Sequence, residues 1–76
     1  MPTLARLANC KVTLYSADHL PPHFHVLMND GIEALISIAS LEQIRGSVPQ
    51  RELSAALNWA RLNQALLIRT WKELNP

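Results

Sequence analysis

The sequence predicts an α+β fold, in which an antiparallel sheet packs on one face against a long C-terminal helix. Apolar and polar residues alternate with period two in several stretches between residues 11 and 38, as in strands with one buried face. After Pro49 no glycine or proline interrupts the chain up to Leu74, and apolar residues recur there at helical spacing. These two patterns describe one small domain that spans residues 1–76.

The composition is that of a globular chain. Its 76 residues are 49% hydrophobic and 17% charged, and the net charge of +1 gives no general argument for nucleic-acid binding. The single cysteine, Cys10, excludes an intramolecular disulfide and a cysteine zinc site, so we expect a reducing compartment. Residues 1–6 lack the apolar core of a signal peptide, and no run of about 18 apolar residues is present to span a membrane. We therefore expect a cytoplasmic protein.

Three strands are expected, at residues 11–16, 23–28 and 32–38. The last two are joined by Asn29-Asp30-Gly31, whose residue types predict a hairpin. A two-residue loop would pair apolar with polar positions, whereas a three-residue loop pairs Phe24 with Ile36 and keeps each face uniform. The three-residue loop therefore predicts a face toward the helix, made of Phe24, Val26, Met28, Ile32, Ala34 and Ile36. The face turned away from the helix contains His23, His25 and Leu35.

The segment before the helix allows two interpretations. Residues 42–45 form either a short fourth strand or a single helical turn that ends at Gly46. Ser47, Pro49 and Gln50 together resemble a helix start, with Ser47 as the cap and Pro49 in the first turn. We therefore expect a helix over residues 49–74.

On one straight helix the apolar residues form two separate stripes. The broader stripe is expected to cover the sheet, and it contains Leu53, Ala56, Leu57, Ala60, Leu67, Ile68, Trp71 and Leu74. The second stripe contains Trp59, Leu62 and Leu66. Because a straight helix cannot turn both stripes to the sheet, we expect either a break near Asn63 with a fold-back, or contact of the second stripe with another chain or a second copy.

All three histidines of the chain lie within seven residues, in the segment from Asp18 to His25. Pro21 and Pro22 stiffen this segment, since proline fixes its own φ and restricts the residue before it. The imidazole groups are therefore expected on a restrained backbone. Tyr15 precedes the cluster and is expected near it.

A metal site is one chemical interpretation of this cluster. His23 and His25 are two residues apart on a strand and present two imidazoles on one side, with His19 or Asp18 to complete the ligand set. Zinc is the cofactor that this set of His19, His23 and His25 would bind.

A metal-independent ribonuclease is a second interpretation. His23 and His25 would act as the acid and base, because an imidazole titrates near neutral pH. A cationic group would have to stabilise the charge on the phosphate, and Lys11, Arg45 and Arg51 are the candidates. A third interpretation needs no reaction. The histidines would bond backbone carbonyls around the prolines, and Asp18 would cap the turn.

Four motifs resemble a known family: Met1 to Leu4, Tyr15 with the segment Asp18-His19-x-Pro-Pro-His-Phe-His25, Gly46-x-x-Pro-x-Arg51, and Trp59-Ala60-x-Leu62. They are similar to the bacterial domain of unknown function 4160. The resemblance implies a small protein without an established activity, often encoded beside another small protein in an arrangement like that of a toxin–antitoxin pair. This chain has Asn58 and Asn63 where the family commonly has Glu and His.

The resemblance and the composition together predict a small cytoplasmic interaction module, one part of a toxin–antitoxin-like unit, and favour a protein that is not an enzyme. Its expected partner is a second small protein or another copy of the chain, bound through the second helix stripe. RNA is the alternative partner. The residues expected to contact a partner or substrate are Tyr15, Asp18, His19, Arg45 and Arg51.

Overall fold

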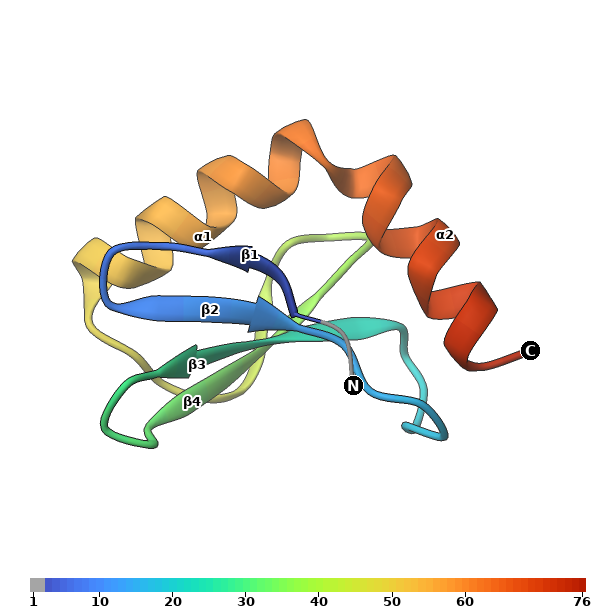
Figure 1. Cartoon of the computed structure of the whole chain (residues 1–76), viewed down its shortest axis with the longest axis horizontal. Coiled ribbons are helices and arrows are strands. Elements are labelled where there is room, and N and C mark those ends of the chain that lie inside the picture. Colours follow the sequence, from blue (N-terminus) through green and yellow to red (C-terminus); the bar gives the residue numbers. More distant parts are fainter. Residues whose placement is uncertain (1–2) are drawn as a thin grey trace.

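The computed structural model describes residues 3–76 and shows an α+β fold, as predicted. Five antiparallel strands follow one another in chain order across a single sheet. They are β1 (Thr3–Arg6), β2 (Cys10–Thr13), β3 (His23–Met28), β4 (Glu33–Ser37) and β5 (Gln43–Gly46). Two helices, α1 (Gln50–Leu62) and α2 (Gln64–Leu74), arch over one face of this sheet (Figure 1). Neither helix is long and apolar enough to cross a membrane, as judged over residues 3–76.

The hairpin of β3 and β4 has the predicted register. Phe24 pairs with Ile36 and His25 pairs with Leu35. The Met28 N–H donates to the Ile32 carbonyl at 2.8 Å and closes a three-residue loop, in which Gly31 has a φ of +94°. The expected faces follow from this register, because cross-strand partners lie on the same side of a sheet. Only Ile32, at the hairpin end and 50% exposed, is poorly covered on the helix side.

The sheet has more strands than the three or four expected. The strand β1 was not predicted, because it is only four residues long and a bulge between Thr3 and Ala5 interrupts its alternation. The strand β2 ends at Thr13, earlier than the expected end at residue 16. Of the two interpretations of residues 42–45, the strand is confirmed, since β5 covers Gln43–Gly46, one residue later than expected.

The expected single helix over residues 49–74 is wrong, and the alternative of a break near residue 63 is confirmed. Asn63 has φ −128° and ψ 23°, outside helical values, and its side-chain amide donates to the Trp59 carbonyl at 2.8 Å. The start also differs from the expectation. The N-cap is Pro49, whose carbonyl accepts from Leu53, and no side chain caps the helix. Ser47 is therefore not the cap.

The hydrophobic core lies between the sheet and the two helices. Its sheet side contains Val12, Leu14, Phe24, Val26, Ala34 and Ile36, each with 0% exposure. Its helix side contains the buried residues Ala56, Ala60, Leu67 and Trp71, with Leu53, Leu57, Ile68 and Leu74 packed around them. The broader helix stripe therefore covers the sheet, as predicted, and its burial is the main source of stability.

The second helix stripe is only partly buried within one chain. The bend at Asn63 packs Trp59 against the core, but Leu62 is 87% exposed and Leu66 is half-buried. The chain bends into an arch and does not fold back on itself (Figure 1). The fold-back interpretation is therefore wrong for Leu62, and coverage of this residue by another chain stays a prediction.

Replacement of Gly46 by alanine should destabilise the fold by about 2–3 kcal/mol. Gly46 has a φ of +73°, and a Cβ at this position would clash with the Glu33 carbonyl oxygen on β4. Gly31→Ala is the control, because its φ is also positive but nothing lies within 4 Å of its Cβ position. We expect this control to cost about 1 kcal/mol. Urea denaturation measures both, and equal losses would contradict the role of the clash.

Candidate functional site

The candidate site forms where the loop between β2 and β3 meets the end of α2 (Figure 1). Ala17 takes a left-handed conformation with φ 56° and turns the loop back toward the sheet. Asn75 then fixes the loop from the far end of the chain. Its side-chain oxygen accepts the Asp18 N–H at 2.9 Å, and its amide nitrogen donates to the Tyr15 carbonyl at 3.3 Å.

Three side chains converge in this site on a single carboxylate oxygen. The Asp18 Oδ2 atom lies 3.0 Å from His23 Nε2 and 3.1 Å from His25 Nε2. The three atoms are all within 4.8 Å of one another. Alternation along β3 puts both imidazoles on the sheet face opposite Phe24, as predicted, although His23 at the start of the strand also contacts helix α2.

The other nitrogen of each imidazole is held by an acceptor. His23 Nδ1 lies 2.8 Å from the Pro21 carbonyl oxygen, and His25 Nδ1 lies 3.2 Å from Glu33 Oε2. A carbonyl only accepts hydrogen bonds, so His23 Nδ1 carries a proton, and in the neutral ring His23 Nε2 presents its lone pair to Asp18. Each ring nitrogen of His25 faces a carboxylate oxygen, so either nitrogen of His25 can donate.

This arrangement leaves His23 incompletely satisfied. Its Nε2 atom is buried and, although close to Asp18, lies in no hydrogen-bond geometry with any group of residues 3–76. A buried polar atom without a partner costs about 1–3 kcal/mol. His25 differs, because its Nε2 atom hydrogen-bonds to Asp18 and its ring is flanked by two carboxylates.

Aromatic side chains enclose the two histidines. The ring of His23 packs against Trp71 on α2, with 5.3 Å between ring centroids, and only 3% of His23 is exposed. Contact of His23 with a helix was not predicted, since His23 was expected on the face turned away from the helix, and it arises because the bent chain brings Trp71 over this ring. The ring of His25 makes an edge contact with Tyr15 at 4.4 Å, which confirms that Tyr15 adjoins the cluster.

The Asp18 carboxyl is held in its ionised form. Burial acts to raise its pKa, but the hydrogen bond from His25 and that from the backbone N–H of His19, together with the charges of the two histidines, lower the pKa below its ordinary value. Asp18 is therefore an anionic ligand at neutral pH.

The spacing of these atoms suits the ligands of one metal ion. Two ligands at 2.0–2.1 Å from a tetrahedral ion lie about 3.3 Å apart. The Asp18 to histidine distances of 3.0 and 3.1 Å are close to this value. The contacts of both Nδ1 atoms with Pro21 and Glu33 are also those that orient metal-binding imidazoles in proteins.

His19 is not one of the converging residues. It is exposed, and its backbone N–H donates to Asp18 Oδ1 at 3.0 Å. Its side chain lines a separate hollow of about 160 Å³ together with His23 and Arg45. Asp18 therefore completes the three-residue group, in the place that the sequence interpretation gave to His19.

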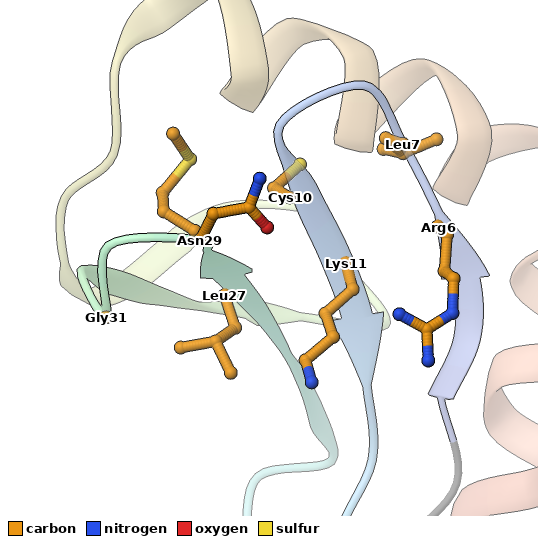
Figure 2. A pocket seen from close by; sticks show the side chains of 8 residues that line it. Arg6, Leu7, Cys10, Lys11, Leu27, Asn29 and Gly31 are labelled. Carbon is orange, nitrogen blue, oxygen red and sulfur yellow. The ribbon is translucent and has the colours of Figure 1, made fainter.

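The remaining candidates lie apart from the cluster. Arg51 is at the start of α1, where it lines a hollow beside the loop between β1 and β2. Lys11 lies on β2 in a hollow of about 380 Å³, into which the side chains of Arg6 and Lys11 extend from neighbouring strands (Figure 2). Cys10 adjoins this hollow, but burial, with a smaller effect of Glu52, raises the pKa of its thiol. The thiol is therefore a weak nucleophile.

Two residues of the site were not predicted as site residues. Trp71 was expected only in the apolar helix stripe, and Asn75 carried no signal at all. The Asn75 side chain reaches Asp18 across 57 positions of sequence, and local patterns do not report such contacts.

Comparison with known proteins supports the resemblance of the motifs. The family model described as Domain of unknown function (DUF4160) matches residues 10–72, which is most of the chain. The chain belongs to the DUF4160 family. No curated protein and no solved structure matches this DUF4160 chain. The first two residues of the Met1 to Leu4 motif lie outside the residues that the structure describes.

Replacement of Asn75 by alanine should destabilise this DUF4160 domain by about 1–2 kcal/mol, since two hydrogen bonds to the Asp18 loop are lost. Asn58→Ala is the matched control, because Asn58 is exposed and bonds only the Arg61 side chain. We expect the control to change stability by less than about 0.5 kcal/mol. Urea denaturation of both variants gives the comparison, and an Asn75 effect no larger than the control would contradict the anchoring role.

Proposed function

We propose that this DUF4160 domain binds a divalent transition-metal ion, with zinc as the first candidate, through Asp18, His23 and His25. Two neutral imidazoles and one carboxylate form a ligand set that zinc accepts in proteins. The remaining coordination positions would be filled by water or by a ligand.

One observation carries this proposal: both Nδ1 atoms are engaged with acceptors while both Nε2 atoms point at the same carboxylate oxygen. Hydrogen bonds alone leave this arrangement incomplete, because His23 Nε2 is buried without a bond. A cation among the three atoms would accept both lone pairs and offset the Asp18 charge.

The same geometry gives less support to a metal-independent ribonuclease. An acid–base pair must reach the reacting oxygens of a substrate. Both Nε2 atoms face Asp18, and that of His23 is buried. Arg45 shares a hollow with His23, but Lys11 and Arg51 line other hollows.

Metal-free protein titrated with zinc in a calorimeter should bind one ion per chain. His23→Ala, His25→Ala and Asp18→Asn should each abolish binding, because each removes one of three ligands. His19→Ala should bind zinc like the wild type, since its ring is outside the group. Glu33→Gln should weaken binding by about 10–100-fold, the usual effect of losing the partner that orients a metal-binding histidine. Magnesium should not compete, because it prefers oxygen ligands.

Circular dichroism should first show that each variant is folded. Zinc at 100 times its dissociation constant should also stabilise the wild type by about 2.7 kcal/mol. The proposal is wrong if wild-type protein binds no zinc, or if His19→Ala loses binding as His23→Ala does. If the wild type binds no zinc and His23→Ala is less stable by about 1–2 kcal/mol, the result would instead favour a structural role of the histidines.

A second candidate function is an interaction module in a two-protein unit, and the exposure of Leu62 favours it. Leu62 ends α1 at the bend, is 87% exposed, and lies beside the half-buried Leu66. An exposed leucine of this kind suits a contact with another apolar surface. The occupant that we propose is a second copy of this chain.

Light scattering at increasing concentration should then give the mass of a dimer for the wild type and that of a monomer for Leu62→Gln. Leu20→Gln is the control, because Leu20 is also 78% exposed but lies in the loop between β2 and β3. A monomeric wild type at all concentrations, or an equal effect of Leu20→Gln, would contradict self-association through Leu62.

A further inference from the structure

The face of the sheet opposite the helices carries cationic side chains on both sides of the histidine cluster, two on one side and one on the other. On one side, Arg6 of β1 lies directly opposite Lys11 of β2. On the other side, Arg45 of β5 lies opposite Leu35, which itself pairs with His25. Cross-strand partners share a face, so these cations lie on the same face as His25.

The Arg6 and Lys11 pair is electrostatically unfavourable by itself. Like charges directly opposite each other on neighbouring strands are destabilising. Within residues 3–76, neither side chain forms an ion pair with a carboxylate. Both extend into the same hollow, with Leu27 on its other side (Figure 2). An anion bound between the two groups would remove this repulsion.

Arg45 has a comparable position on the far side of the cluster. It lines the hollow of about 160 Å³ with His19 and His23, and in the described part of the chain it also has no ion pair. Asp18 and Glu33, the two carboxylates near the cluster, contact the histidines and form no ion pair with these cations. The open face is therefore positive on both sides of its centre.

We propose that this face binds the phosphate backbone of a single-stranded nucleic acid. Lys11 and Arg45 are on strands three positions apart, which is about 14 Å at the usual strand spacing. One phosphate group cannot contact both, whereas a strand of several nucleotides can. Guanidinium and ammonium groups are the usual partners of phosphate oxygens.

The shape of the face favours a single strand over a duplex. The surface is one side of a five-stranded sheet, and the two helices arch over the other side (Figure 1). Within residues 3–76, this face therefore presents no helix that could enter the groove of a duplex. Open sheets bind single strands with bases stacked on their aromatic side chains. The half-buried Tyr15 ring, which contacts His25 between the two cationic positions, is the aromatic side chain that we assign to such stacking. This interaction does not require the metal.

The test is fluorescence anisotropy with labelled ten-nucleotide oligouridylate and oligothymidylate, in the presence of a chelator, at several salt concentrations. Binding should weaken as salt rises, because phosphate contacts release counterions. Arg6→Gln, Lys11→Gln and Arg45→Gln should each weaken binding several-fold and lower the slope of log K against log salt by about 0.7. Comparison of the oligouridylate with the oligothymidylate shows whether the face binds RNA, DNA or both.

Arg69→Gln on α2 is the matched control, because it removes the same charge from an exposed position on the helix side. It should leave affinity and slope unchanged. The chelator keeps metal out of the assay, so a failed zinc titration would leave this result intact. The inference is overturned if neither oligonucleotide binds at low salt, or if a duplex or a mononucleotide binds as tightly as the single strands. It is also overturned if Arg69→Gln weakens binding as much as Lys11→Gln does, or if Arg45→Gln has no effect.

Discussion

The position of the Asp18 carboxylate is the constraint on which the candidate site depends. One of its oxygens contacts both His23 and His25, and the other accepts the backbone N–H of His19. The hydrogen bond to Asp18 orients His25, whereas His23 is oriented by its contacts with the Pro21 carbonyl and Trp71. The carboxylate is in turn fixed through its backbone by Asn75. The chemistry of the site thus rests on one loop residue held by the last turn of the chain.

The bend at Asn63 allows the helices that cover the hydrophobic core to reach the Asp18 loop as well. A straight helix would carry the end of the chain onward past the sheet, whereas the bent chain brings α2 down to the loop between β2 and β3 (Figure 1). The bend has two consequences for the site. Trp71 packs on His23 and removes it from solvent, and Asn75 reaches Asp18. The bend does not bury Leu62, which stays 87% exposed at the end of α1.

The open face of the sheet carries the histidine cluster at its centre and cationic side chains on its flanks. At the centre, His25 lies between the carboxylates of Asp18 and Glu33. At the flanks, Arg6, Lys11 and Arg45 form no ion pair within the described residues. The net charge of +1 conceals this distribution, because it sums over the helices as well. Charge that is arranged on one face matters for binding even where the total is near zero.

The sequence by itself determined the features that depend on local spacing. The hairpin register, the face of His23 and His25, the helix stripe that covers the sheet and the family all followed from residues close together in the chain. The tertiary structure decided the rest. It selected Asp18 in place of His19 as the third residue of the cluster, buried His23 under Trp71, and added β1 to the sheet. These outcomes depend on contacts across up to 57 positions, and the energy of such contacts is set by packing that no local pattern records.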